Sequence, residues 1–360
     1  MAKLHNFSAG PAALPSSVIE KTRASLLDLG GSGIGLVESS HRSVPFDVVI
    51  DDARERVARL LKLNDDQEVL FLHGGAQTQF FMVAMNLLNG GHAAYLDTGR
   101  WSMLAAKEAA RFGSVHTLFD SSGSNYDHVP TAGSWGKVPE GAQYLHYTSN
   151  NTVAGTQYNY IPDAQGVPLV CDASSDILSA PIDGSKFDIL YAGAQKNLGP
   201  SGVTLVVFRK NLLAKCNPDL PTMLRYETHV TKGSMYNTPN TFGIYVIGQT
   251  LRWIEEQGGL EAVAQKNQRQ ADYLYNEIDN SSLFQGMAQR ASRSLMNVTF
   301  TTKDSDLDTL FWKTALEEGI SGLKGHRSIG GLRASIYNAQ RDDAIDALVA
   351  FMKRFEKNHG

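Results

Sequence analysis

A single lysine, Lys196, stands where an apolar run of the sequence gives way to small residues. It follows the run 187–194 and precedes Asn197-Leu198-Gly199-Pro200, and the nearest other cationic side chains in sequence are Lys186 and Arg209. In a partly dry pocket the charged form of a lysine is disfavoured, so the pKa falls and the amine becomes a nucleophile toward carbonyl groups. Taken alone, a lysine at a strand end is more often simply solvated.

An aspartate, Asp172, ends a second apolar run, 167–171. A carboxylate there could pair with a pyridinium nitrogen and keep it protonated, so that the ring acts as an electron sink. The alternative is that Asp172 is a cap or turn residue. Because Asp172 and Lys196 each stand at the carboxyl end of a predicted strand, together they favour a site for pyridoxal phosphate.

These two residues belong to a series of short apolar runs that we predict to be strands. Helical patterns at 78–88 and 101–111 alternate with the earlier runs, which is typical of a mostly parallel, doubly wound α/β sheet. Ligands bind such sheets beyond the carboxyl ends of the strands. The predicted strands are 68–72, 93–97, 114–119, 143–148, 167–172, 187–191 and 203–208.

After Gly258 and Gly259 the pattern changes to that of a smaller α+β domain. It predicts helices at 260–278, 307–318 and 342–356, with strands at 295–302 and 331–337. We therefore expect residues 16–258 to form a large cofactor-binding domain. Residues 259–360, together with the N-terminal segment 1–15, are expected to form the small one.

Composition excludes several classes of protein. With 42% hydrophobic and 19% charged residues among 360, the chain has too little charge to be disordered. A net charge of −4 without a long basic run argues against a nucleic-acid partner. Two cysteines supply neither a disulfide framework nor a Cys-rich metal site, so we expect no metal and a reducing, cytoplasmic location. No signal peptide or membrane span is predicted.

Common nucleotide and hydrolase motifs are absent. The glycines of 30–35 do not fall at the G-x-G-x-x-G positions, and Gly136-Lys137 is not part of a P-loop. There is no H-E-x-x-H, C-x-x-C or G-x-S-x-G motif. Nicotinamide-dependent, ATP-dependent and simple hydrolase functions therefore lose most of their support.

The chain resembles the phosphoserine aminotransferases, which are fold-type I pyridoxal-phosphate enzymes of class V. The resemblance spans almost the whole sequence in the expected order, and its motifs are too numerous to arise by chance. It implies a large domain with a mostly parallel seven-stranded sheet flanked by helices, plus a smaller α+β C-terminal domain. The matching segments are 6–12, 41–43, 73–80, 172–175, 193–200, 237–239 and 325–338.

The resemblance also implies roles around the cofactor. Lys196 would hold pyridoxal phosphate as a Schiff base and then shuttle a proton between the substrate Cα and the cofactor C4′, while Asp172 would face the ring nitrogen. Trp101 would stack on the ring, although an aromatic residue that anchors the core at a helix start is the alternative. The remaining cofactor contacts would be Thr152 to the phenolic oxygen, Ala76, Gln77 and Gln195 to the phosphate, and Asn237 and Thr238 reaching across from the other subunit of a homodimer.

The substrate would present two anions, a carboxylate and a phosphate. Arg333 resembles the family arginine that grips the α-carboxylate with a bidentate fork. The phosphate would fall to two His-Arg pairs, His41-Arg42 and His326-Arg327. Some members of the family carry Gly-Arg where this chain has Ala76-Gln77, so its affinity for phosphate would rest more heavily on Arg42 and Arg327.

The reaction so implied is that of a phosphoserine:2-oxoglutarate aminotransferase. L-glutamate would supply the amino group that converts 3-phosphohydroxypyruvate to O-phospho-L-serine in serine biosynthesis; use of 3-hydroxy-2-oxo-4-phosphonooxybutanoate, in pyridoxal phosphate synthesis, is left open. One alternative is a lyase or desulfurase of the same fold, but Cys171 lies in a predicted buried strand and Cys216 in a linker. Another is a non-catalytic pyridoxal phosphate binding protein.

Overall fold

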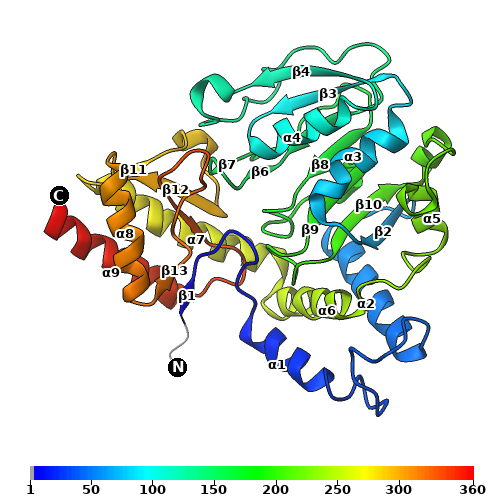
Figure 1. The fold of residues 1–360 in the computed structure, drawn as a ribbon, viewed down its shortest axis with the longest axis horizontal. Coiled ribbons are helices and arrows are strands. Elements are labelled where there is room, and N and C mark those ends of the chain that lie inside the picture. Colours follow the sequence, from blue (N-terminus) through cyan, green and yellow to red (C-terminus); the bar gives the residue numbers. More distant parts are fainter. Residues whose placement is uncertain (1–3) are drawn as a thin grey trace.

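The computed structural model describes residues 4–360, so the first three residues of the expected N-terminal segment 1–15 lie outside it. Its main feature is a seven-stranded sheet in the order β2-β10-β9-β8-β5-β3-β4 (Figure 1). β10 runs opposite to the other six strands and pairs antiparallel with β2 and β9, while the remaining pairs are parallel, which confirms the predicted mostly parallel α/β sheet. The strands are β2 (Gln67–Leu72), β3 (His92–Asp97), β4 (Ser114–Asp120), β5 (Leu145–Thr148), β8 (Leu169–Asp172), β9 (Ile189–Gly193) and β10 (Thr204–Arg209).

Helices cover both faces of this sheet. Alternation along β9 sends Leu190 toward one face and Tyr191 toward the other, and both are fully buried. Leu190 belongs to a cluster with residues of α2 (Val44–Leu60) and α6 (Thr241–Glu256), whereas Tyr191 packs with residues of α3 (Gly75–Leu87) and α4 (Arg100–Ala109). Burial on both faces explains why these strands read as continuous apolar runs.

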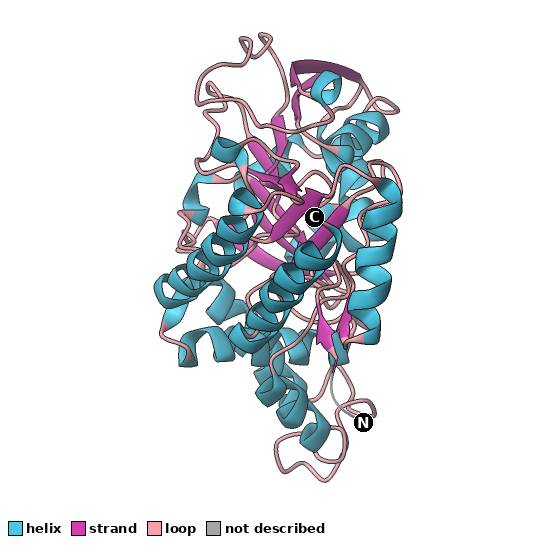
Figure 2. Cartoon of the chain, turned by 90° about the vertical axis from the view of Figure 1, so that its left-hand side faces the viewer, coloured by secondary structure: helices cyan, strands magenta, loops and turns pink. Residues whose placement is uncertain are grey.

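A second, smaller unit follows α6. It contains the antiparallel sheet β11-β12-β14, and Figure 2 views it end-on with the C-terminus toward the reader. Phe300, Phe311 and Phe355 pack in a hydrophobic cluster of its own. Its elements are α7 (Gly259–Asn280), β11 (Gln285–Gly286), β12 (Asn297–Thr301), α8 (Ser305–Glu317), β13 (Ile320–Ser321), β14 (Leu332–Ser335) and α9 (Asp342–His359).

The start of the chain joins this smaller unit. Strand β1 (His5–Asn6) pairs in parallel with β13, and Phe7 is fully buried in the cluster of Phe300 and Phe311. Helix α1 (Ser16–Ser25) instead packs against α6. These contacts support the proposed division into 16–258 and 259–360 with 1–15, which stays a prediction.

Several element boundaries differ from the sequence prediction for local reasons. Strand β8 begins at Leu169 rather than 167 because Pro168 has no N–H to donate to the ladder. Helices α1 and α2 were not predicted. The shorter elements are β6 (Asn150–Asn151), β7 (Thr156–Gln157) and α5 (Tyr226–Thr231).

Within residues 4–360, no helix has the length and apolar character that crossing a bilayer requires.

Candidate active site

Lys196 lies in the turn that follows β9 and extends toward Thr152. Its Nζ donates a hydrogen bond to Thr152 Oγ1 at 2.8 Å, and Thr152 itself is buried. Burial lowers the pKa of Lys196 to about 8; the carboxylate of Asp172 acts in the opposite direction, and the guanidinium of Arg333 lowers the pKa further. About a tenth of this amine is therefore neutral at pH 7, far more than for an ordinary lysine, and the neutral amine is the nucleophile.

Asp172 occupies the carboxyl end of β8, next to β9 in the sheet. Its Oδ1 accepts hydrogen bonds from the backbone N of Ser174 at 3.0 Å and from Ser174 Oγ at 2.6 Å. Its Oδ2 receives none from the described residues, and the side chain lines a cavity. Burial raises the pKa of Asp172, while Lys196 and Ser174 favour its ionised form.

Ser174 therefore orients the carboxylate, a role that the sequence analysis did not assign. Its Oγ also accepts from the backbone N of Gly193, at 3.1 Å, and so ties the end of β8 to the end of β9. The sequence contains a signal for this contact, because in an Asp-x-Ser pattern the aspartate side chain can accept a hydrogen bond from the backbone N–H two residues later.

The cavity that Lys196 and Asp172 share has a volume of about 340 Å³. One wall is the start of α3, where Gly74 adopts a left-handed conformation with φ of +99°. A Cβ on Gly74 would lie 2.1 Å from Thr78 Oγ1, so only glycine fits this turn. The first turn of α3 lacks a side-chain cap, which leaves backbone N–H groups and the positive helix end for an anion. The lining residues are Gly74, Gly75, Ala76, Gln77, Phe80, Trp101, Asp172, Ser174, Gln195 and Lys196.

Trp101 forms another wall, at the start of α4. The Nζ of Lys196 lies 5.9 Å from the centroid of its ring. Its Nε1 is buried and has no hydrogen-bond partner among residues 4–360. Trp101 lines the cavity, but a group bound there would not reach this enclosed N–H.

Several cationic side chains lie on the side of Lys196 that faces the smaller unit. Arg333, on β14, donates from Nη1 to the backbone oxygen of Thr152 at 3.2 Å, and burial lowers its pKa. Burial also lowers the pKa of His326, with further contributions from Arg100, Arg333 and Arg327. The structure therefore places Arg100, Arg327 and Arg333 close enough to His326 to affect its protonation. The sequence did not point to Arg100, and the binding roles of His326, Arg327 and Arg333 stay predictions.

Of the predicted residues, Ala76, Gln77, Trp101, Asp172, Gln195 and Lys196 line the cavity, whereas Thr152, His326, Arg327 and Arg333 do not. The remaining four predicted residues do not line it either. The segment that connects α1 and α2, which carries His41 and Arg42, lies at the opposite end of the molecule from α8 and α9 (Figure 1). There Arg42 Nε donates to His41 Nε2 at 3.4 Å. Asn237 and Thr238 are exposed, and the backbone oxygen of Thr238 bonds His73 Nε2 at 3.1 Å. Their roles stay predictions.

A second carboxylate, that of the half-buried Asp176, lies close to this site and was not predicted. It accepts hydrogen bonds from Ser149 Oγ at 2.5 Å and from Gln157 Nε2 at 3.1 Å. Burial raises its pKa to about 6, and the negative charge of Asp172 acts in the same direction while Lys196 opposes it. No pattern in the sequence separated this aspartate from a turn residue.

Comparison with known proteins agrees with this geometry. The family model for class-V aminotransferases matches residues 4–348. The chain is 51% identical to a phosphoserine aminotransferase of Desulfatibacillum aliphaticivorans, over 99% of each chain. The chain belongs to the phosphoserine aminotransferase family. A solved member from Bacillus circulans subsp. alkalophilus has a TM-score of 0.97 at 47% identity and covers 99% of each chain. A pyridoxal-phosphate-bound member from Trichomonas vaginalis has a TM-score of 0.92 at 36% identity, over 98% of this chain and all of that one.

Proposed function

We propose that this chain catalyses the amino-group transfer of a phosphoserine aminotransferase. L-glutamate and 3-phosphohydroxypyruvate are converted to 2-oxoglutarate and O-phospho-L-serine, the amino-donating step of serine biosynthesis. The observation that carries the proposal is that the half-buried Lys196 and the buried Asp172 line one cavity whose wall is a helix N-terminus. Full-length identity near 50% to proteins of that name supports it.

The cavity fits pyridoxal phosphate. Its volume of about 340 Å³ lies within the range of small-molecule pockets, roughly 300–1,000 Å³. Two groups there have no partner among the described residues: Asp172 Oδ2 and the first-turn amides of α3. When bound, this cofactor supplies an electron sink that stabilises negative charge at the substrate Cα. Ala76, Gln77 and Gln195 would hold its phosphate, and Trp101 would cover its ring.

Lys196 has two tasks in this proposal. Its amine holds the cofactor covalently and, once released by an amino-acid substrate, moves a proton at the substrate Cα. The lowered pKa of Lys196 suits both tasks, because the neutral amine is the nucleophile and the base. Asp172 provides the negative charge that keeps the ring nitrogen protonated, and Thr152 supplies a hydroxyl beside Lys196.

Two anion subsites would position the substrate. Arg333, half-buried beside Thr152, would grip the α-carboxylate. His326 and Arg327 would bind the phosphate of phosphoserine. His41 and Arg42 cannot join them within one chain, because their segment lies at the opposite end of the molecule (Figure 1). We propose that a second subunit brings its own His41-Arg42 pair to this site.

A homodimer is therefore part of the proposal. The surface around the segment between α1 and α2 exposes apolar side chains, with Leu27 at 84% and Val44 at 75% of their areas accessible. Exposed apolar clusters of this kind mark interaction surfaces. Asn237 and Thr238 are also exposed, as expected if they serve the cofactor of the neighbouring subunit.

A desulfurase function is disfavoured by the raised pKa of both cysteine thiols. Burial strongly raises the pKa of Cys171, and burial raises that of Cys216 to about 12, so neither is a reactive thiolate. Both are free cysteines, which supports the proposed cytoplasmic location. Turnover of 3-hydroxy-2-oxo-4-phosphonooxybutanoate by the same site remains part of the proposal, since that substrate carries the same two anions.

The half-reaction with L-glutamate tests the proposal. The protein loaded with pyridoxal phosphate should show a visible absorbance band that bleaches when L-glutamate is added, and Lys196→Ala should lose both the band and turnover. Lys186→Ala, at an exposed lysine outside the cavity, is the matched control and should behave as the parent protein. A band that does not respond to glutamate would instead favour a non-catalytic binding protein.

Phosphate selection needs a separate measurement. Arg42→Ala and Arg327→Ala should each raise the KM for phosphoserine much more than the KM for glutamate. Equal effects on both substrates would show that the phosphate subsite is misassigned.

A further inference from the structure

One face of the small sheet lies against a hairpin of the large unit. In the register of β12 and β14, Asn297 pairs with Ser335 and Thr299 pairs with Arg333. Paired residues of antiparallel strands point to one face, and so do residues two apart on a strand, so these four side chains share a face. The hydroxyl of Thr299 donates at 2.9 Å to a backbone oxygen of the hairpin β6–β7, residues 150–157. This face therefore joins the two units beside the active site.

Asn297 is the centre of this contact and was not among the predicted site residues. It is fully buried, and its Oδ1 accepts from Asn150 Nδ2, on the hairpin, at 2.8 Å. Its own Nδ2 donates to Ser335 Oγ at 3.0 Å and to Tyr337 Oη at 3.2 Å. One side-chain amide therefore ties the hairpin to two residues that follow Arg333 closely in the chain.

Asn150 is held from both units. Its Oδ1 accepts from Ser294 Oγ of the smaller unit at 2.6 Å. Its Nδ2 also donates to Ser175 Oγ, which follows β8, at 2.9 Å. All of these side chains are buried, and a buried polar network whose members are bonded specifies one rigid arrangement. The hairpin is therefore fixed relative to the end of β8 and to β12 at once.

The hairpin carries the residue that Lys196 and Arg333 both contact. That residue is Thr152, whose Oγ1 accepts from Lys196 Nζ at 2.8 Å and whose backbone oxygen accepts from Arg333 Nη1 at 3.2 Å. We propose that Asn297 is a positioning residue, which holds Arg333 where it can bind the carboxylate of a substrate whose amino group is at Lys196. The role of Asn297 rests on the proposed function, in which Arg333 binds that carboxylate.

Carboxylate binding by a guanidinium is sensitive to such placement. Two parallel N–H···O bonds form only in one relative orientation of the partners. A misplacement of about 1 Å, caused by a change away from the reacting atoms, can lower a rate by as much as about 10²-fold. Loss of the Asn297 amide would free β14 from the hairpin. Recognition of the carboxylate should then fall more than the reactivity at Lys196.

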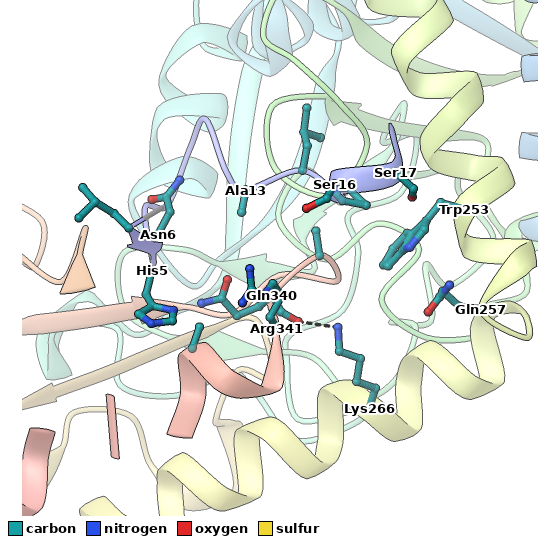
Figure 3. Close-up of a pocket in the computed structure, with 15 residues that line it drawn as sticks. His5, Asn6, Ala13, Ser16, Ser17, Trp253, Gln257, Lys266, Gln340 and Arg341 are labelled. Carbon is teal, nitrogen blue, oxygen red and sulfur yellow. Dashed lines mark hydrogen bonds between the residues drawn. The ribbon is translucent and has the colours of Figure 1, made fainter. Parts of the chain in front are cut away.

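A second asparagine provides a matched control. Asn267, on α7, is also fully buried, and its Nδ2 donates to Ser179 O of the large unit and to a further asparagine side chain, both at 2.9 Å. Figure 3 shows the neighbouring Lys266 beside a cavity of about 310 Å³ that shares no lining residue with the cavity of Lys196. Asn267→Leu therefore removes hydrogen bonds between the units while it leaves those of Asn297 in place.

Two aminooxy compounds that react with the pyridoxal-phosphate-loaded protein test the proposal. Aminooxyacetate carries a carboxylate, and O-methylhydroxylamine lacks one. Loss of the visible band gives a second-order rate constant for each, which is divided by its value for free pyridoxal phosphate. The ratio should favour aminooxyacetate by about tenfold or more in the parent protein, and Arg333→Gln should remove most of this preference. Asn297→Leu should lower the ratio by about fivefold or more, while Asn267→Leu should leave it unchanged.

The cofactor-free protein gives a second readout. The guanidinium of Arg333 lowers the pKa of Lys196, so the pH at which limiting acetic anhydride half-labels Lys196 reports the position of Arg333. Asn297→Leu should move this midpoint to higher pH, in the same direction as Arg333→Gln. Asn267→Leu should not move it.

Three results would overturn the role of Asn297. An unchanged ratio in Asn297→Leu, with a lowered ratio in Arg333→Gln, would make Asn297 merely structural and leave the proposed function intact. An equal loss in Asn267→Leu would indicate general loosening of the two units. Absence of any preference in the parent protein would remove the carboxylate subsite itself. If Asn297→Leu does not fold, Ser294→Ala, which removes the 2.6 Å bond to Asn150, should lower the ratio about threefold, and an unchanged ratio there would decide against the proposal.

Discussion

The pKa of Lys196 gives a direct and quantitative test of the catalytic site. Burial lowers it from 10.5 to about 8, and this difference corresponds to roughly 3 kcal/mol against the charged form. At pH 8, about half of the Lys196 amines should be neutral. An ordinary lysine would have only about one neutral amine in 300 at that pH.

Competitive acetylation of the cofactor-free protein measures this difference. Limiting acetic anhydride would be added at pH values from 6 to 11, and the acetylated peptides would be quantified by mass spectrometry, with the exposed Lys186 as the reference for reagent decay. The labelling of Lys196 should reach half its maximum near pH 8.

Two variants test the direction in which neighbouring charges shift the pKa of Lys196. Asp172 raises the pKa of Lys196 and Arg333 lowers it. Asp172→Asn should therefore move the labelling midpoint to lower pH, and Arg333→Gln should move it to higher pH. A midpoint at or above pH 10 in the parent protein would refute the account of a dry pocket around the amine. An upward shift in Asp172→Asn would refute the stabilising effect of that carboxylate on the charged amine.

Three further changes test the parts around Lys196. Ser174→Ala removes a 2.6 Å hydrogen bond to Asp172 and should lower kcat by about tenfold, since a bond to a charged group contributes about 1.5–3 kcal/mol; an unchanged kcat would deny the positioning role. Gly74→Ala would put a Cβ 2.1 Å from a threonine hydroxyl at φ of +99° and should cost about 1–3 kcal/mol in thermal unfolding. Gly90→Ala, with positive φ but open space, should cost less; equal losses would mean that the clash is unimportant. Arg327→Ala should lower kcat/KM for phosphoserine about tenfold, with little change for glutamate in the same assay.

The pairing of Asp172 with Lys196 was predictable because it depends on local pattern and one rule of topology. Each residue follows an apolar run, and parallel strands place their carboxyl ends at one edge of the sheet. The register of β8 and β9 then aligns Asp172 with Tyr191, a few residues before Lys196. Neither step requires knowledge of distant contacts.

The rest of the site depends on contacts that no local pattern contains. Arg100 approaches His326 only because two units of the fold meet there, and their sequence separation exceeds 200 residues. The two His-Arg pairs look equivalent in sequence, yet the fold places the segment of His41 at the far end of the molecule. Helix α2 was overlooked because its burial depends on α6, almost 200 residues away.

The path of the first residues has a practical consequence for handling the protein. Ala12 donates from its backbone N to Gln195 O at 2.9 Å, and Tyr337 Oη donates to Ala9 O at 2.8 Å. A Cβ on Gly10 would lie 3.7 Å from Lys196 Cγ. A purification tag fused before β1 would thus pull on a segment that rests against Lys196. The last residues of α9 are exposed, so the carboxyl end of the chain is the better place for an affinity tag or a surface anchor.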